Sequence, residues 1–391
     1  MTSTVSSHQL IVVGNGFDLE CGLNSRFIDF FAPRFKAIDS IIDYTQIEWT
    51  EAVEKAGLTA WDFILRRNTD SNWCDIEEVI RRWVVKPKVG TPIIEGVYKA
   101  SERINKYPFA NPVHVRCGNR LADEEKDDAY VYGNVARRIW MIIDPVQAQS
   151  FNQRELFPIL QSELKMLEDA FDAYLREEVA SKYAYQTRCK NLYEKIECDG
   201  LPDPSEETVD TSVLSFNYTR PFTDRIVGPG LNEKDVLNIH GRLSNGLIFG
   251  VDGSDCMGDE DALPFTKTYR VAIAGTHISR NIFRPAPSGM NSTTRFIKFY
   301  GHSLGEPDYS YFQSIFDGVD LYGGNTKLFF YYRPWKKSNG KKASEETART
   351  AMVKRVSKLL TTYGKTLDNT DHGKNLMHKL LLEGRLEIKK I

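Results

Sequence analysis

Two polar side chains suited to catalysis follow short apolar segments of the chain. Asn217 lies in SFNYTRPF and His240 lies in NIHGRL, each directly after residues that favour a strand. An amide donates and accepts hydrogen bonds at once, so Asn217 is suited to position a water or a ribose hydroxyl. An imidazole titrates in the range that general-base catalysis needs. The alternatives are a loop-capping asparagine and a structural histidine bonded to backbone.

A glycine loop follows the first apolar segment. The residues LIVV run into Gly14-Asn15-Gly16, and Asp18 comes two residues later. Glycines at the end of a strand let backbone N–H groups approach a phosphate closely, although the same pattern also makes a tight turn. Leu19 occupies the position of the third glycine in Gly-x-Gly-x-x-Gly, and no acid-ended strand follows about 20 residues later. A hydride-transferring dehydrogenase is therefore not favoured.

The segment FYGHSLGEPDYSYF, residues 299–312, carries a third group of candidates. A strand is expected to break at Gly301, after which His302, Ser303, Glu306 and Asp308 lead into the start of a helix. Ser303 and Asp308 are the two that matter for its N-terminus. Either side chain can cap that helix, and the N-terminus of the helix can instead face an anion. We predict that Gly301, Ser303 and Asp308 belong to the same binding site.

The same segment supports a competing interpretation. GHSLG, from Gly301 to Gly305, fits the Gly-x-Ser-x-Gly pattern of a nucleophile elbow, which also lies between a strand and a helix. In a hydrolase of that kind the histidine follows the serine and the acid in the chain, which leaves His372 and His378 as bases. A serine hydrolase is therefore kept as an alternative.

Five short apolar segments after residue 210 are expected to be strands that position these residues. They are rich in β-branched and aromatic residues, most end in or near Gly, Asn or Asp, and several are separated by connections of helix length; they span 212–218, 235–241, 247–252, 295–301 and 326–332. With the first apolar segment, this spacing predicts a parallel α/β sheet. Ligands of such sheets lie beyond the carboxyl ends of the strands. We therefore expect Asn217, His240 and Asp252 to share an edge with the glycine loop.

The pattern divides the chain into three regions. Residues 1–50 and 211–340 are predicted to form an α/β nucleotide-binding domain, residues 51–210 a mainly helical insertion, and residues 341–391 a basic helical C-terminal segment. Ser344 is the predicted N-cap of that segment. Its 12 Lys and Arg against 6 Asp and Glu leave a local excess of +6.

Composition narrows the class of protein. Hydrophobic residues make up 41% and charged residues 27% of the 391 residues, as in an ordinary globular protein. The net charge of −2 gives no long-range attraction to nucleic acid or to a membrane surface. No apolar run approaches the ~18 residues of a spanning helix, and the N-terminus lacks the features of a secretory signal. We expect a soluble, cytoplasmic protein that does not associate with a membrane.

The cysteines do not follow a metal-binding pattern. They form no Cys-x-x-Cys pair and no Cys/His cluster at zinc-finger spacing; the six are Cys21, Cys74, Cys117, Cys189, Cys198 and Cys256. In a large intracellular chain this usage favours reduced thiols over disulfides and argues against a structural zinc.

The order of these motifs resembles the bacteriophage abortive-infection family AbiH. The opening GNGFDLECGLNSRFIDFF is similar to the family's Gly-Asn-Gly-Phe-Asp-Leu signature, which is followed by Gly-Leu and an aromatic-x-Asp-Phe segment. NWCDIEEVI, SFNYT, NIHG, LIFGVD, GHSLGEPD and LMHKLLLEGRL also look like family blocks, in order and nearly end to end. The combination is specific, whereas each block alone is not.

The arrangement is more distantly similar to sirtuin-like domains, which bind NAD. Those domains open with a Gly-Ala-Gly loop and a Gly-Ile-Pro-Asp-Phe segment, compared here with residues 14–16 and 22–27, and their Asn and His correspond to Asn217 and His240. The middle residue of the loop is Asn here in place of a small residue, Asp18 has no obvious counterpart, and the four-cysteine zinc module of the deacetylases is missing. The missing module argues against protein deacetylation.

The resemblance implies a sirtuin-like, Rossmann-type parallel sheet with a large helical insertion and a C-terminal helical tail. It also implies a phage-defence protein that hydrolyses the N-glycosidic bond of NAD to nicotinamide and ADP-ribose. NAD is then the substrate. The reaction passes through an oxocarbenium-like state and needs a fixed sugar, a positioned water and a base, but no metal.

On this basis each candidate has an expected role. The loop at residues 14–16 holds the pyrophosphate, Asn217 positions the attacking water or the ribose, His240 is the general base, and Asp18 orients a ribose or the loop. A phage-derived trigger and self-association are further expected partners. Two alternatives stay open: a nucleotide sensor without catalysis, and a toxin that uses the basic tail and helical block to engage nucleic acid.

Overall fold

The computed structural model describes most of the predicted sheet and the helices around it. The described residues are 5–40, 52–68, 76–84, 153–203, 205, 207–221, 235–256, 258–274, 282–284, 292–335, 341–367 and 370–391. Cys74, Cys117 and the side chain of His372 lie outside the described part of the chain.

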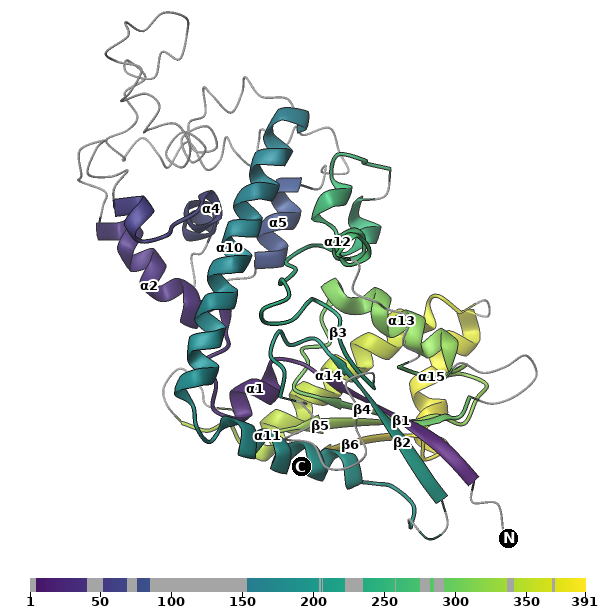
Figure 1. Ribbon diagram of the computed structural model, residues 1–391. Coiled ribbons are helices and arrows are strands. Elements are labelled where there is room, and N and C mark those ends of the chain that lie inside the picture. Colours follow the sequence, from purple (N-terminus) through teal and green to yellow (C-terminus); the bar gives the residue numbers. More distant parts are fainter. Residues whose placement is uncertain are drawn as a thin grey trace, which may run out of the picture. The chain divides into compact units, whose positions relative to one another are not determined.

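Six parallel strands form one sheet in the order β3-β2-β1-β4-β5-β6 (Figure 1). They are β1 (Val5–Val13), β2 (Glu207–Ser215), β3 (Val236–Asn238), β4 (Thr294–Tyr300), β5 (Lys327–Tyr332) and β6 (Leu386–Lys390). The sheet grows from β1 toward β3 on one side and then from β4 toward β6 on the other. The predicted α/β class is confirmed, and the strand order is that of doubly wound Rossmann sheets, with its reversal between β1 and β4.

Both faces of the sheet are buried, which explains the continuous apolar runs of its central strands. Successive residues of a strand point to opposite faces. In β1, Leu10 and Val12 therefore belong to one hydrophobic core, and Ile11 and Val13 belong to another. All four side chains are completely buried.

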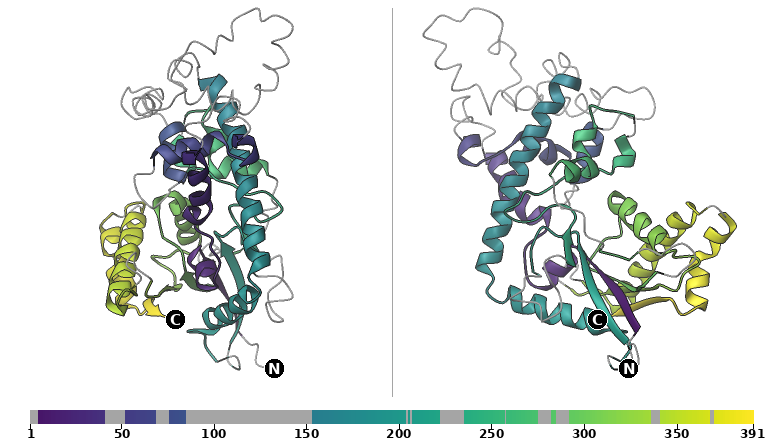
Figure 2. Two further views of the ribbon diagram at one scale, coloured as in Figure 1. Left: turned by 90° about the vertical axis from the view of Figure 1, so that its left-hand side faces the viewer. Right: turned by 45° about the vertical axis from the view of Figure 1, so that its right-hand side comes forward.

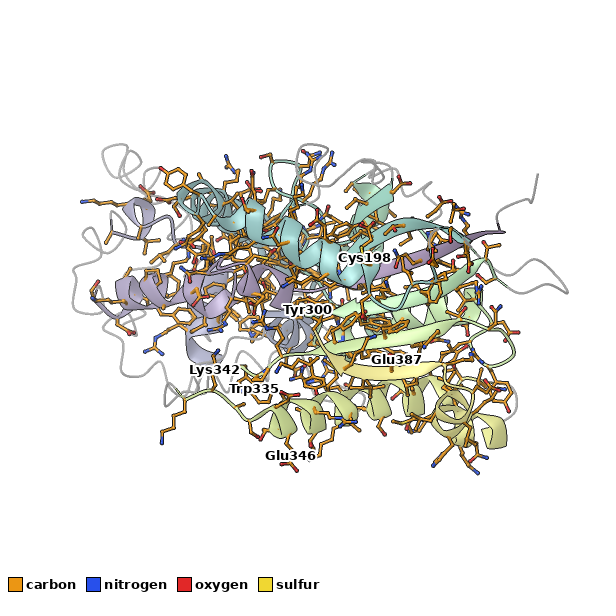
Figure 3. The ribbon with its side chains drawn as sticks, turned by 90° about the horizontal axis from the view of Figure 1, so that it is seen from below. Cys198, Tyr300, Trp335, Lys342, Glu346 and Glu387 are labelled. Atoms are coloured by element: carbon orange, nitrogen blue, oxygen red, sulfur yellow. The ribbon has the colours of Figure 1, made fainter. Side chains whose placement is uncertain are left out.

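Different helices cover the two faces. On the face of Leu10 lie α13 (Tyr309–Gly318), α14 (Glu345–Gly364) and α15 (Thr370–Leu382). On the face of Ile11 lie the short α1 (Gly16–Glu20) and α11 (Tyr185–Cys198). Figure 2 shows α14 and α15 on one side of the sheet, and Figure 3 shows α11 on the other, ending at Cys198.

The chain divides into two compact units. The sheet unit comprises Met1–Asn24, Glu178–Asn245 and Gly275–Ile391, and a helical unit comprises Ser25–Glu177 and Gly246–Ala274. The helical unit contains α2 (Phe27–Ser40), α4 (Ala60–Asn68), α5 (Ile76–Val84), most of α10 (Gln153–Ser181), the 3-10 helices η4 (Gly253–Cys256) and η5 (Leu263–Phe265), and α12 (Lys267–Ile273). No helix among the described residues is long and apolar enough to cross a membrane.

One predicted strand is wrong. The segment 247–252 lies in the helical unit and is not a strand of the sheet, so Asp252 does not stand at a strand end of that sheet. Phe249 N–H donates to Glu168 (2.6 Å) and Phe249 C=O accepts from Arg270 (2.5 Å). Side chains of α10 and α12 therefore satisfy the backbone groups that a sheet ladder would use.

The last strand of the sheet was not expected from the sequence. Residues 345–391 contain α14 and α15, as their apolar periodicity predicts, but they end in β6, which pairs with β5. The predicted N-cap is confirmed, because Ser344 Oγ accepts the N–H of Thr347 (3.1 Å). The 3-10 helix η6 (Glu306–Asp308) precedes α13 on the way from β4 to β5.

Candidate functional site

Backbone hydrogen bonds join the carboxyl ends of four neighbouring strands at one edge of the sheet. Beyond the strands themselves, Phe216 N–H donates to Val13 (2.9 Å), Ile239 N–H to Ser215 (3.0 Å), and Gly14 N–H to Tyr300 (3.0 Å). The residues that follow β3, β2, β1 and β4 are thereby held side by side. This edge contains the point at which the strand order reverses, where open α/β sheets bind their ligands.

Close backbone packing explains the glycines at this edge. A Cβ on Gly16 would lie 2.6 Å from the Cα of Gly301, and a Cβ on Gly14 would lie 2.6 Å from the Cα of His302. Gly301 has a φ of +70°, and a Cβ there would lie 2.5 Å from the N atom of Phe17. The loops after β1 and β4 therefore meet at distances that only glycine allows.

The amides of the two loop glycines already have acceptors. Gly14 N–H donates to Tyr300, and Gly16 N–H donates to the carbonyl of Gly301 (2.8 Å). Phe17 N–H donates to Gly14 (2.8 Å). A phosphate at this loop would need donors other than these three amides. Asn15, between the glycines, is exposed.

Gly301→Ala tests this packing. The added methyl meets backbone atoms at a positive φ, so we expect a loss of about 2–4 kcal/mol in the free energy of unfolding, measured by urea denaturation. Gly305→Ala in the same loop is the matched control, because its Cβ would meet only Ser303 Oγ at 3.3 Å and Pro307 Cδ at 3.5 Å. Equal stability of both variants would contradict the close-packing explanation.

Asp18 follows the glycine loop and is buried on the face of the sheet that α11 covers. Its side chain is 1% exposed, and its two oxygens accept from the hydroxyls of Tyr185 (2.7 Å) and Thr219 (2.7 Å). Burial raises the pKa of Asp18 to about 6, and the hydrogen bonds from Tyr185 and Thr219 oppose that rise. Burial also raises the pKa of Tyr185 well above its ordinary value.

Asn217 is held by its backbone while its amide stays unsatisfied. Its N–H donates to Ser215 Oγ (3.2 Å), and the Asn238 amide donates to the carbonyls of Asn217 (2.8 Å) and Thr219 (2.9 Å). The residue is 4% exposed, yet neither Oδ1 nor Nδ2 has a hydrogen-bond partner among the described residues. A buried amide in this condition can bind a hydroxyl group or a water through a donor and an acceptor.

A second group of candidates lies on the opposite face of the sheet. The carboxylate of Asp308 is 3.3 Å from His240 Nε2 and 3.3 Å from His302 Nε2. The N–H of Leu304 donates to His302 Nδ1 (2.9 Å), so the proton of neutral His302 is on Nε2 and points to Asp308. The ring of Phe216 packs edge-on against both imidazoles.

The predicted residues are thus brought together in two groups at one edge. Asn217 and Asp18 form the first group, because Thr219 donates to Asp18 and shares the Asn238 amide with Asn217. His240 and Asp308 form the second group, and the packed glycines lie at the same strand ends. Ser303 is exposed at this edge, close in the chain to the half-buried Asp308 of the second group.

The serine-hydrolase alternative finds no support in this geometry. Ser303 Oγ accepts the N–H of Gly305 (3.3 Å), and no hydrogen bond joins it to a histidine in the part of the chain that is described. The non-glycine residue with a positive φ in this segment is Leu304 (57°), whereas a nucleophile elbow places its strain at the serine.

Two residues of these groups were missed from the sequence. Thr219 lies inside a quoted motif, two residues after Asn217, and this position was the available signal. Tyr185 begins α11 and is 167 positions from Asp18, so no local pattern points to it. Within the described ranges, no group of three or more His, Cys, Asp or Glu side chains is arranged to hold a metal ion.

Comparison with known proteins identifies the family. A sequence model described as bacteriophage abortive infection AbiH matches residues 10–332, from β1 to the end of β5. Neither the curated proteins nor the solved structures that were searched contain a match. Because the family match spans most of the chain, this protein belongs to the bacteriophage abortive infection AbiH family, and its role is abortive-infection defence against phage.

Proposed function

We propose that this chain hydrolyses the N-glycosidic bond of NAD at the carboxyl edge of its sheet, releasing nicotinamide and ADP-ribose. The observation that carries the proposal is the buried amide of Asn217, which has no hydrogen-bond partner among the described residues. Each unsatisfied buried polar group costs about 1–3 kcal/mol. A ligand with hydroxyl groups, such as a ribose, removes that cost.

The strand order supports a dinucleotide as the ligand. Rossmann sheets with the order 3-2-1-4-5-6 bind dinucleotides across the crevice where the order reverses, and here the reversal lies between β1 and β4. Asn217 follows β2 and His240 follows β3, so both lie beyond neighbouring strand ends at this edge. A dinucleotide is long enough to contact residues that follow different strands.

The two groups supply what the hydrolysis needs. The bond between ribose C1′ and the nicotinamide nitrogen breaks, and its electron pair leaves with nicotinamide. The water oxygen bonds to C1′ and its proton passes to the general base. Asn217 would hold the water or a ribose hydroxyl, and His240, next to the carboxylate of Asp308 at 3.3 Å, would accept the proton.

In the proposed site the backbone amides of Gly14 and Gly16 do not bind the phosphates. The amides of Gly14 and Gly16 are engaged in the contact with β4. Asn15 and Ser303 are exposed on the two loops that the glycines bring together. We therefore assign the pyrophosphate to these two side chains, while the glycines set the distance between the loops.

The test is release of nicotinamide from NAD by the purified chain, with and without lysate from phage-infected cells. Asn217→Ala is expected to lower the rate by about 10²-fold, because the water and the ribose lose a fixed partner. Asn245→Ala is the matched control, since Asn245 is exposed on the turn after β3. Thermal unfolding of both variants checks that they fold.

The outcomes separate the alternatives. NAD binding without release would make the chain a nucleotide sensor, and absence of both would contradict a nucleotide site. Binding of nucleic acid by the basic tail is less well supported, because several lysines of the tail already form ion pairs. These are Lys358 with Glu306 (2.8 Å), Lys390 with Glu345 (2.7 Å) and Lys389 with Asp199 (2.6 Å).

A further inference from the structure

The loop after β2 is hydrogen-bonded to β3 and to the loop after β3 through three consecutive carbonyls. The side-chain amide of Asn238 donates to the carbonyl oxygens of Asn217 (2.8 Å) and Thr219 (2.9 Å). The N–H of Leu243 donates to the carbonyl between them, that of Tyr218 (2.9 Å). Two of these three hydrogen bonds therefore come from one side chain.

The contacts of the Asn238 amide determine its orientation. Both of its partners are carbonyl oxygens, which only accept hydrogen bonds, so the nitrogen of the amide must face them. The two hydrogens of Nδ2 are thereby used, one for each carbonyl. Leucine and aspartate have nearly the size of asparagine but offer no donor, so neither can make these two bonds.

Asn238 connects the two strand ends that carry the candidate residues. It is the last residue of β3 and precedes His240 by two positions. In the register of the sheet it lies opposite Ser215, the last residue of β2, whose Oγ accepts the N–H of Asn217 (3.2 Å). The Asn238 side chain therefore joins the end of β3, which leads to His240, to the loop that carries Asn217.

These bonds explain how the side-chain amide of Asn217 stays buried without a hydrogen-bond partner among the described residues. An unsatisfied buried polar group costs about 1–3 kcal/mol, so a loop that could move would turn this amide toward a partner or toward water. Here the backbone N–H of Asn217 is held by Ser215 and its carbonyl by Asn238. The amide therefore keeps its place for a ligand, as a group of a preorganised site does.

We propose that Asn238 is a positioning residue, which clamps the loop after β2 so that the amide of Asn217 is held at the carboxyl edge for its ligand. The kinetic part of this inference rests on the proposed hydrolysis of NAD, but the clamp itself does not. In this role Asn238 acts through Asn217 and makes no contact with NAD.

Asn238→Leu tests the role through kinetics, because it removes both donors at nearly constant size. We expect kcat for NAD hydrolysis to fall by about 10- to 100-fold, since the loop no longer fixes the Asn217 amide. Asn238→Gln keeps an amide on a longer side chain and is expected to retain more of kcat than Asn238→Leu.

Thr326→Val is the matched control. Thr326 is buried directly before β5, at the opposite edge of the sheet, and its hydroxyl donates to the carbonyl of Thr294 (2.8 Å). This variant also leaves a carbonyl without its side-chain donor, but it is expected to keep kcat unchanged. Equal losses of kcat in Asn238→Leu and Thr326→Val, at equal loss of stability, would contradict a positioning role.

A double variant separates positioning from a general loss of structure. Asn217→Ala combined with Asn238→Leu is expected to be no slower than Asn217→Ala alone, because Asn238 acts through Asn217. Losses that add in the double variant would show that Asn238 affects the reaction by another route, and would overturn the proposal.

A test without turnover uses the side-chain NH₂ signals of Asn217 in ¹⁵N NMR spectra, assigned by their loss in Asn217→Ala. Asn238→Leu is expected to split or broaden these signals, because the loop then takes more than one conformation. Thr326→Val is expected to leave them as they are in the wild type. Thermal unfolding of both variants checks that they fold.

The two readouts fail separately. Asn217 signals that stay single and sharp in Asn238→Leu would overturn the positioning role, whatever the chain does with NAD. Signals that split or broaden in this variant, while the wild type releases no nicotinamide, would support the clamp and contradict the proposed reaction.

Discussion

Replacing His240 by Ala is expected to lower kcat for NAD hydrolysis by about 10²–10⁴-fold, the usual contribution of a positioned general base. His240 follows β3 at the edge where Asn217 also lies, and its Nε2 is 3.3 Å from the carboxylate of Asp308. At this distance the carboxylate stabilises the imidazolium that forms when the ring accepts a proton. Single-turnover measurement of nicotinamide release isolates the chemical step.

Asp308→Asn tests whether the contribution of His240 to kcat depends on the carboxylate of Asp308. We expect a smaller loss, and a double variant with His240→Ala that is no slower than His240→Ala alone, because the two side chains act as one unit. Additive losses in the double variant would mean that Asp308 acts independently of His240.

His302→Asn is the matched control for the two histidines that face Asp308. An asparagine Oδ1 can accept the Leu304 N–H that His302 Nδ1 now accepts, so the loop keeps its hydrogen bond. This variant is expected to change kcat much less than His240→Ala. If it removes activity while His240→Ala does not, His302 is the base.

The apolar runs of the sequence located most of the sheet. The first segment and four of the five later ones overlap β1, β2, β3, β4 and β5, because strands buried on both faces need continuous apolar sequence. β6 was missed since LEIKK is polar, as expected of an edge strand with one side open. The segment 247–252 was misassigned because burial alone does not distinguish a sheet strand from an extended segment whose backbone bonds to helix side chains.

The candidate site was located from the sequence, but the contacts within it were not. The sequence predicted that Gly14 and Gly16 form a phosphate loop. Glycine is required at these positions because the loop packs against the backbone of Gly301 and His302, far away in the chain. The burial of Asp18 depends on Tyr185, and its loss of contact with solvent could not be read from GNGFDL. Local patterns therefore predict which residues follow a strand, but not what packs against them.

The largest effect on stability is expected in the helical unit, from Arg270→Met. Glu168 is completely buried, and Arg270 donates to both of its oxygens, at 2.5 Å and 2.8 Å. Burial raises the pKa of Glu168, and the hydrogen bonds and charge of Arg270 oppose the rise. Removing the guanidinium leaves a buried carboxylate without its cation, which costs about 3–5 kcal/mol. Urea denaturation followed by tryptophan fluorescence measures the loss.

A double variant decides whether the charge or the shape of this pair matters. Glu168→Gln added to Arg270→Met removes the uncompensated charge while keeping an acceptor for the Phe249 N–H, so part of the lost stability should return. Arg66→Met is the control, because the two side chains of its ion pair with Asp39 are 37% and 47% exposed and such pairs contribute about 0–1 kcal/mol. A loss for Arg270→Met no greater than that of the control would mean that Glu168 takes up a proton at little cost. The segment 247–252 would then be held by its apolar side chains, and the two hydrogen bonds to Phe249 would not be the reason it stays out of the sheet.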